Sequence, residues 1–264
     1  MAIITISRGT YSGGRALAES LGTHLGYRVT SREILLAEAA ALFDASEEEL
    51  EHALLHRPGF LERRRLGRLH YIRCLEAALA RAAQGDNLVY HGQAGHLLLR
   101  GVPHHLRVLV VADMEYRIAA SRRRDLVTRR QAIRMIREAD KARDEWVKRI
   151  YGVDRDDLTT FDLAINLQDI PIPNACEIIA RVVESDFPTT PESQEIMDNL
   201  VLASDVRARI GLDEEIEDDK LEVSASHGRV TVSGKARTLH QTRRVEELVR
   251  QIPGVTEVEC HAGV

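Results

Sequence analysis

The chain has 264 residues, enough for one large domain or two smaller domains that each bury a core. It carries 36 Lys and Arg against 41 Asp and Glu, and aromatic residues make up 4% of it, so a basic, aromatic-rich nucleic-acid-binding protein is the weakest reading. Three isolated cysteines argue against a disulfide framework and against a CxxC zinc site, and no apolar run approaches the roughly 20 residues of a membrane span.

A strand, a glycine-rich turn and a helix open the chain. The β-branched run at residues 3–6 leads into Ser7-Arg8-Gly9-Thr10-Tyr11-Ser12-Gly13-Gly14-Arg15, and helical apolar periodicity follows. Glycines in such a turn let backbone N–H groups converge on an anion at a helix N-terminus. The segment therefore predicts a phosphate-binding loop. The first residues also lack the basic segment and apolar core of a leader, so we expect a cytoplasmic protein.

The loop departs from the usual phosphate-binding loop. Gly9 and Gly14 have the GxxxxG spacing, but Arg15 stands at the lysine position and Ala16 at the hydroxyl position. If Ser12-Gly13 is matched to the usual Ser-Gly instead, Gly14 takes the lysine position and Arg15 the hydroxyl position. Arginine can grip a phosphate with two parallel hydrogen bonds, so phosphate binding stays a prediction, whereas loss of the hydroxyl weakens the case for a normally held Mg²⁺. A turn that binds no ligand is the alternative.

Further strands are predicted at 88–90, 106–111 and 161–165, and they alternate with helical segments. This alternation is typical of a parallel sheet flanked by helices, in which the long β-branched run 106–111 is expected to lie centrally. The helical stretch from Ser31 to the strand at 88–90 is where phosphotransfer enzymes place an acceptor-binding subdomain. Arginines on this stretch face either an anionic substrate or solvent: Arg57, Arg63, Arg64, Arg65, Arg68 and Arg73.

A second basic region follows the strand at 106–111, on two predicted helices joined near residues 126–128. Arginines over a phosphate site can neutralise charge on a transferring group, and closure of a lid excludes water. We therefore expect a lid here. Within it, Arg137, Asp140 and Arg143 repeat every three residues and share one broad helix face, where the carboxylate can orient the arginines. A structural ion-pair ladder is the alternative.

The segment 185–193 contains two prolines among small polar residues and interrupts any helix. We therefore predict a first domain at residues 1–185, a linker at 186–194 and a second domain at 195–264. Residues 195–264 carry 14 acidic and nine basic residues, so this part holds the net charge of −5. Its pattern predicts a helix, a hairpin around His227-Gly228, a second helix and a last strand, an αββαβ arrangement.

Several motifs occur in a characteristic order over residues 1–184. In chain order they are Ile4-Thr5-Ile6-Ser7-Arg8 leading into Ser12-Gly13-Gly14-Arg15, Leu25-Gly26-Tyr27 before Ser31-Arg32-Glu33-Ile34, Leu88-Val89-Tyr90-His91-Gly92, Arg107-Val108-Leu109-Val110, Arg117, Asp140-x-x-Arg143 and Phe161-Asp162-Leu163-Ala164-Ile165-Asn166. With them the segment resembles the cytidylate-kinase-like family of P-loop nucleoside monophosphate kinases. The resemblance implies a three-layer α/β core with a parallel sheet between helices. It also implies transfer of the ATP γ-phosphate, with Mg²⁺, to CMP, dCMP or a related nucleoside monophosphate.

The resemblance also implies roles for particular residues. The ATP phosphates would be held by Arg8, Ser12, Gly13, Gly14 and Arg15. The acceptor would be bound by Arg32, Gly92 and Gln93. The catalytic group would comprise Arg15, Arg137, Asp140 and Arg143. No residue is assigned as a metal ligand, because Mg²⁺ would arrive with the nucleotide.

Three positions differ from the usual residues of that family. Tyr11 stands in place of a glycine, Ser31 in place of an acidic residue and Gln93 in place of an arginine. Together with the missing lysine and hydroxyl, these changes support an alternative function, a catalytically inactive nucleotide or anion sensor that signals through the second domain. Nucleic-acid binding through the arginine-rich helices is a third possibility, and it predicts affinity that falls steeply with salt.

The second domain has glycines at the turn and end of its hairpin, Gly228 and Gly234, and Pro253-Gly254-Val255 before its last strand. With Val223, Val230, Val232 and Val258 this pattern closely resembles the BON domain. The resemblance implies contact with membranes or phospholipids, or docking on other proteins. A net charge of −5 is repelled by an anionic leaflet and no exposed aromatic cluster marks an insertion point, so we favour a regulatory or protein-docking role. Oligomer formation stays open.

Overall fold

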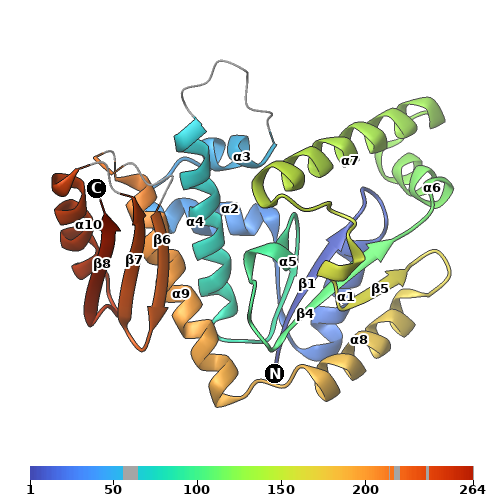
Figure 1. The fold of residues 1–264 in the computed structure, drawn as a ribbon. Coiled ribbons are helices and arrows are strands. Elements are labelled where there is room, and N and C mark those ends of the chain that lie inside the picture. Colours follow the sequence, from blue (N-terminus) through green and yellow to red (C-terminus); the bar gives the residue numbers. More distant parts are fainter. Residues whose placement is uncertain (56–64, 214, 217–220, 236–237, 264) are drawn as a thin grey trace. The chain divides into compact units, whose positions relative to one another are not determined.

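The computed structural model describes residues 1–55, 65–213, 215–216, 221–235 and 238–263. The chain forms two compact units (Figure 1). Unit 1 comprises Met1–Ile34 and Gly85–Thr190, and unit 2 comprises Leu35–Gln84 and Pro191–Val264. The boundary between the units falls within helix α2 (Arg32–Phe43), so this helix belongs to both.

Unit 1 is built on one parallel sheet. Its strands are β1 (Ile3–Arg8), β2 (Arg28–Ser31), β3 (Leu88–His91), β4 (His105–Val111) and β5 (Leu163–Asn166). They lie in the order β2-β3-β1-β4-β5, and every neighbouring pair is parallel. The predicted parallel sheet is thus confirmed. The strand predicted at 106–111 lies inside the sheet, beside the middle strand β1.

Helices cover both faces of this sheet, which confirms the three-layer prediction. Helices α1 (Gly14–Leu25) and α8 (Ile172–Asp186) pack against one another on one face, and the short α5 (Gly95–Leu98) packs on β1 and β4 at the other. Alternate residues of β1 point to opposite faces. Ile4 and Ile6 join the buried core under α1 and α8, whereas Thr5 and Ser7 contact histidines on the α5 side.

Two helices follow β4 and form the predicted hairpin: α6 (Met114–Asp125) and α7 (Arg129–Tyr151). Asp113 caps α6 by accepting from the Tyr116 N–H, and Thr128 with Gln131 forms a capping box at the start of α7. Between them Leu126 adopts a left-handed conformation that ends α6. Local capping interactions therefore set both ends of α6 and the start of α7. A short 3-10 turn, η1 (Leu158–Thr160), precedes β5.

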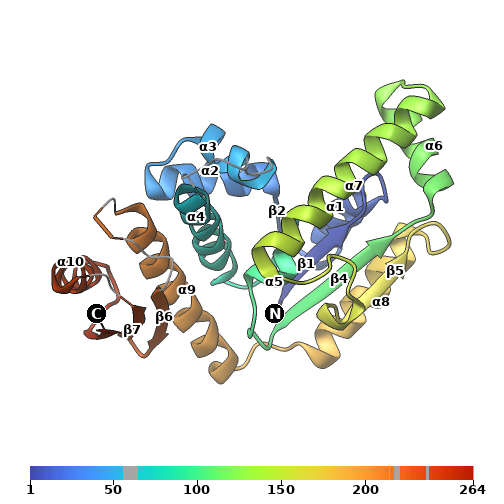
Figure 2. The same ribbon diagram turned by 45° about the horizontal axis from the view of Figure 1, so that its top comes forward.

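Unit 2 contains α3 (Glu47–Leu55), α4 (Arg65–Ala83), α9 (Pro191–Leu212), β6 (Leu221–Ser226), β7 (Arg229–Lys235), α10 (Leu239–Arg250) and β8 (Glu257–Gly263) (Figure 2). From α9 onward the order is αββαβ, as predicted. The sheet order is β6-β7-β8, with β6–β7 antiparallel and β7–β8 parallel. His227 and Gly228, both at positive φ, make the hairpin turn. No helix in the described ranges has the length and apolarity needed to cross a bilayer.

Candidate functional site

The glycine-rich loop joins β1 to the N-terminus of α1. Gly13 is the N-cap residue at φ 91°, and no side chain caps the helix, so the first N–H groups of α1 lack an intrahelical partner. The Ser12 hydroxyl and backbone N–H both donate to the Gly9 carbonyl, at 2.9 and 3.3 Å, which closes the loop. A Cβ atom on Gly14 would lie 2.5 Å from Cδ of Arg8, so only glycine fits there. The loop therefore presents backbone donors to an anion.

Tyr11 connects this loop to the α6–α7 hairpin. Its backbone is left-handed, at φ 63°, and its hydroxyl donates to the Asp125 carboxylate. The Arg124 guanidinium lies 4.7 Å from the Tyr11 ring centroid, a cation–π contact. The ring also packs on the apolar cluster of Ile118, Ala132 and Ile136. The residue that replaces the family's usual glycine is thus part of the hairpin's core.

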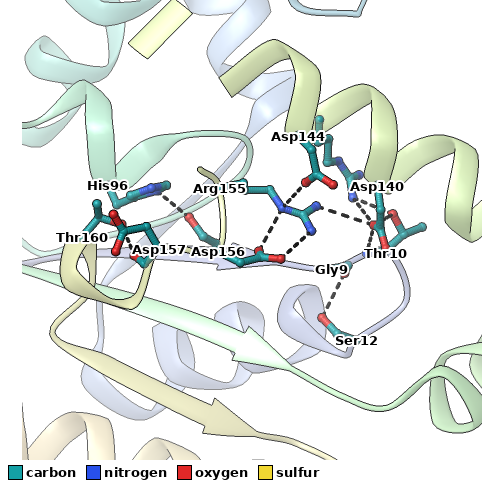
Figure 3. A network of polar contacts seen from close by, with 12 residues as sticks. Gly9, Thr10, Ser12, His96, Asp140, Asp144, Arg155, Asp156, Asp157 and Thr160 are labelled. Atoms are coloured by element: carbon teal, nitrogen blue, oxygen red, sulfur yellow. Dashed lines mark hydrogen bonds and ion pairs between the residues drawn. The ribbon is translucent and has the colours of Figure 1, made fainter. Parts of the chain in front are cut away.

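Asp140 of α7 binds the glycine-rich loop at Thr10 (Figure 3). Its Oδ1 accepts from the Thr10 N–H at 3.2 Å and from the Thr10 hydroxyl at 2.9 Å, and its Oδ2 pairs with Arg117. Burial would raise the pKa of Asp140, but the hydrogen bonds from Arg117 and Thr10 hold it below the usual value. Arg143 donates to the Thr10 hydroxyl at 2.6 Å. Asp140 is therefore ionised and fixes the loop to α7.

Next to the loop, at the carboxyl ends of β1 and β3, lies a pocket of about 100 Å³. Its cations come from three elements and one connecting segment: Arg8 ends β1, Arg32 begins α2, Arg143 lies on α7, and Arg155 follows α7. One carboxylate, Glu33, faces them. The other lining residues are Ser7, Gly92, Gln93, Ala94, His96 and Val147.

The arginines of the pocket affect one another's ionisation. Burial, together with the charges of Arg8, Arg155 and Arg32, lowers the pKa of Arg143 to about 10. Burial also lowers the pKa of Arg8, with further contributions from Arg32 and Arg15. Arg155 is held by Asp144 at 3.0 Å and Asp156 at 3.1 Å (Figure 3). A bound anion would reduce the repulsion among these guanidinium groups, so the pocket is suited to a phosphate or carboxylate.

The structure gathers the predicted acceptor residues into one place. Arg32, Gly92 and Gln93 all line the pocket, and Arg8 joins them there. Arg143 also lines it, while Asp140 acts on the loop beside it.

Two predicted residues lie apart from the pocket. The Arg15 side chain is 71% exposed and its Nε donates to Glu19 at 2.8 Å, one turn along α1. Arg137 is an exposed residue of α7. Both catalytic assignments stay predictions, and neither side chain lines the pocket.

Four polar or charged residues that line the pocket were not predicted: Arg155, His96, Ser7 and Glu33. Ser7 and Glu33 lay inside motifs already noted, so their neighbours Arg8 and Arg32 were the available signal. Arg155 and His96 lie in short segments that show neither a motif nor a periodic apolar pattern. In the helical stretch after Ser31, Arg57, Arg63 and Arg64 fall outside the described residues, as do the side chains of Arg65 and Arg68.

The described residues contain no group of three His, Cys, Asp or Glu side chains arranged to hold a metal ion. Ala16 offers no side-chain oxygen at the start of α1, where the usual loop has a hydroxyl that holds Mg²⁺. These residues therefore do not fit a protein-held Mg²⁺ at the loop, and no step of the chemistry below depends on one.

Comparison with solved structures identifies the fold. A crystal structure of an uncharacterized protein from Eubacterium ventriosum ATCC 27560 matches with a TM-score of 0.54 at 18% identity, over 70% of this chain and 99% of that chain. Shikimate kinase from Acinetobacter baumannii in complex with shikimate has a TM-score of 0.41 at 12% identity, over 72% and 96%. A gluconokinase from Sinorhizobium meliloti 1021 has a TM-score of 0.41 at 13% identity, over 69% and 94%. At 18% identity the first of these likenesses shows the fold alone.

Comparison of sequences identifies the family. No curated protein sequence matches the chain. The BON domain model matches residues 198–263, which cover most of α9 and the sheet of unit 2. The model of the cytidylate kinase-like family matches residues 3–169, more than half of the chain, from β1 through the loop, the pocket and the α6–α7 hairpin to β5. The chain therefore belongs to the cytidylate kinase-like family and carries a BON domain at its C-terminal end.

Proposed function

We propose that the protein transfers the γ-phosphoryl group of ATP to CMP, dCMP or a related nucleoside monophosphate. The new bond forms between an oxygen of the acceptor phosphate and the γ-phosphorus, and the bond from that phosphorus to the β–γ bridging oxygen breaks. ADP and a nucleoside diphosphate result. Such transfer depends mainly on positioning and on electrostatic stabilisation, which arginines and backbone amides can supply.

The loop and the pocket have separate roles in this transfer. The free N–H groups at the start of α1, around Gly13 and Gly14, would hold the ATP phosphates, with Arg15 as the predicted additional cation. Arg8, Arg32 and Arg143 would bind the acceptor phosphate. Arg143 donates to Thr10 of the loop and also lines the pocket, so it is the cation placed between donor and acceptor. Its role would be to stabilise charge on the transferring group.

The observation that carries the proposal is the convergence of four arginines, from three elements and the segment after α7, on one pocket beside the loop. Within the lining the one carboxylate is Glu33, whose side chain is 68% exposed. Asp140, Asp144 and Asp156, which pair with Arg143 or Arg155, stand outside the lining. A phosphorylated ligand would add negative charge inside the pocket.

The test uses the full chain with Mg·ATP and each of CMP, dCMP, UMP and AMP, and chromatography to detect the diphosphate. We expect product from a cytidine acceptor. Arg143→Gln should lower kcat/KM by about 100-fold, as expected for loss of a group that stabilises transition-state charge. Arg149→Gln removes an exposed arginine from the same helix and should leave the rate unchanged. No product from any acceptor at high enzyme concentration would contradict the proposal.

A second candidate function is a catalytically inactive nucleotide or anion sensor. The observation that favours it is the position of Arg15, which pairs with Glu19 at the helix surface while the loop lacks a lysine. The sensor binds ATP or the acceptor without forming product, so calorimetric binding in the absence of turnover supports it. In either case the BON domain is proposed to dock on a protein partner, and the cytoplasmic location stays a prediction.

A further inference from the structure

Several residues that line the arginine pocket have a buried nitrogen atom without a hydrogen-bond partner among the described residues, and three of these atoms are Arg8 Nε, Gln93 Nε2 and His96 Nε2. Folded proteins satisfy nearly all buried polar atoms, so a group of such atoms at one pocket indicates a partner that binds there. A guanidinium Nε and an amide nitrogen can only donate. The ligand therefore presents acceptor oxygens to this wall.

His96 is the least expected of the three. It lies on the short helix α5, its side chain is 2% exposed, and its Nδ1 is 2.8 Å from the Ser7 hydroxyl (Figure 3). The Phe161 ring lies 4.3 Å from the imidazole, centroid to centroid. The hydrogen bond and the ring contact together fix the orientation of the imidazole. Burial, reinforced by His105, Arg107 and Arg100, lowers the pKa of His96 to about 3, so the ring is uncharged at neutral pH.

The bond to Ser7 decides which nitrogen of an uncharged imidazole carries the hydrogen. If the Ser7 hydroxyl donates to Nδ1, the hydrogen is on Nε2, and Nε2 is a donor. The opposite arrangement would place a lone pair toward acceptor oxygens, which repel it. A ligand that presents acceptors to Arg8 and Gln93 therefore requires the Nε2–H form.

His96 also lines a neighbouring cavity of about 450 Å³. Two polar side chains of that cavity are already paired. Arg107 makes two hydrogen bonds to Asp162, at 2.9 and 2.6 Å, and both ring nitrogens of His105 have partners, Thr5 and the Leu99 carbonyl. Arg8 and Gln93 line the arginine pocket and not this cavity, so we place the ligand in the arginine pocket.

We propose that His96, held by Ser7 in the Nε2–H form, is an uncharged donor to the anionic group of the acceptor, together with Gln93. The inference rests on the proposed function for the identity of the acceptor. Its chemistry requires only a compact oxyanion such as a phosphate. The acceptor anion is then bound by charged donors, the arginines of the pocket, and by neutral donors, His96 and Gln93.

The experiment measures binding of inorganic phosphate and of CMP to the full chain by calorimetry. His96→Phe keeps a ring but removes the donor, and we expect affinity for both ligands to fall about 10-fold, the usual worth of a hydrogen bond to a charged group. His96→Gln places an amide nitrogen near the position of Nε2 and should retain affinity within about 3-fold. His24→Gln, on the surface of α1, is the matched control and should bind as the unmodified protein does.

A spectroscopic measurement on the unmodified protein guards against misfolding of the variants. In ¹⁵N-detected NMR, His96 should show a protonated Nε2 and an unprotonated Nδ1, and the Nε2–H resonance should shift when phosphate is added. Ser7→Ala should lose this single form.

The outcomes separate this inference from the kinase proposal. Wild-type affinity in folded His96→Phe, a proton on Nδ1, or failure of the unmodified protein to bind phosphate or CMP would each overturn the role of His96. Loss of phosphate binding in His96→Phe without any diphosphate product from the unmodified protein would support His96 and reject the kinase. Product formation with an unchanged acceptor KM in His96→Phe would do the reverse.

Discussion

Tyr11 adopts the left-handed conformation that a glycine would adopt without strain. For a residue with a Cβ atom this conformation costs about 1 kcal/mol. The cost is offset by the hydrogen bond to Asp125, the Arg124 guanidinium over the ring and packing on Ile118 and Ile136. Burial and the bond to Asp125 raise the pKa of Tyr11, so the hydroxyl keeps its hydrogen as donor. Tyr11 therefore restricts the glycine-rich loop and fixes it to the α6–α7 hairpin.

Removing this side chain should loosen the hairpin. Tyr11→Phe loses the hydrogen bond and should lower the free energy of unfolding by about 1 kcal/mol. Tyr11→Gly relieves the backbone but loses the ring, so a larger loss of about 2 kcal/mol is expected. Urea unfolding gives the stabilities, and hydrogen exchange at residues 122–128 should become faster. A glycine variant as stable as the unmodified protein would show that backbone strain outweighs the contacts.

Buried histidines of unit 1 predict sensitivity to acid. Burial first, and nearby arginines second, lower the pKa of His91 to about 4; burial likewise lowers the pKa of His96 to about 3 and that of His105 to about 4. In the unfolded chain these groups titrate near 6.5, so the unfolded state binds protons first as the pH falls. Stability is therefore full above about pH 6.5 and is lost from there toward pH 4.

The expected loss is up to about 1.4 kcal/mol per pH unit for each histidine within that window. Urea midpoints at pH 7.5, 6.0 and 5.0 measure it. The His96→Gln variant has one group fewer and should show a shallower decline. Equal midpoints at pH 7.5 and 5.0 in the unmodified protein would contradict the buried, neutral state of these side chains.

At the scale of elements, Asp140 connects α7 to the glycine-rich loop and to Arg117 of α6. Its side chain is 16% exposed and that of Arg117 is 12% exposed, so the pair is largely removed from water. Asp140→Asn keeps the shape but leaves Arg117, Arg143 and Arg155 without their shared carboxylate. We expect a loss of about 3 kcal/mol in stability, because an uncompensated charge remains buried.

The matched control is Asp144→Asn, whose carboxylate is 53% exposed and pairs with Arg155. It should cost less than about 1 kcal/mol, because the carboxylate is half in solvent and Arg155 keeps Asp140 and Asp156 as partners. Chemical unfolding of both variants gives the comparison. Similar small losses in the two would mean that Asp140 does not hold the loop.

Which elements could be predicted depended on local signals. The strands β1, β3 and β4 are buried apolar runs, and their positions followed from the sequence. The edge strand β2 was missed because Arg28–Ser31 holds a single apolar residue and pairs on one side only. The hairpin α6–α7 was found through its basic helices and the break at residues 126–128.

The candidate site was predictable where it lies in motifs. The resemblance assigned Arg32, Gly92 and Gln93 to the acceptor, and in the structure all three line the pocket. Arg155 and His96 depend on contacts with Asp144 and Ser7 that no spacing encodes. The role assigned to Arg15 stays a prediction. This residue stands at the lysine position in sequence, but Glu19, four residues later on the same helix face, offers a nearer partner.

At the scale of the whole molecule, the helical stretch Leu35–Gln84 is grouped in one way by the family model and in another way by its spatial contacts. The family model includes it with residues 3–169, whereas its contacts place Leu35–Gln84 in one compact unit with the BON domain. Helix α9 is the reason. Val206 and Ile210 belong to the core of the BON sheet, and the same helix packs along α4. The first helix of the BON domain is therefore also a structural support of the inserted helices.

The contact between α4 and α9 has a polar centre. The Arg81 guanidinium binds the Asp205 carboxylate through two hydrogen bonds, of which Nε to Oδ1 measures 2.7 Å. The Asp205 side chain is 4% exposed and that of Arg81 is 39% exposed. Nearby, Gln84 Nε2 donates to Asp198 at 3.0 Å on the surface. The buried carboxylate is thus the specific element of this interface.

Asp205→Asn should uncouple the two helices. The amide cannot accept both hydrogen bonds from Arg81, and with one partner half in solvent we expect a loss of about 2 kcal/mol. Hydrogen exchange should become faster in α4 and α9 together, while β1, β3 and β4 of unit 1 keep their protection. Asp198→Asn is the surface control and should change neither helix. Faster exchange in α9 alone would mean that α4 does not depend on the BON domain, and the BON domain would then be an independent module.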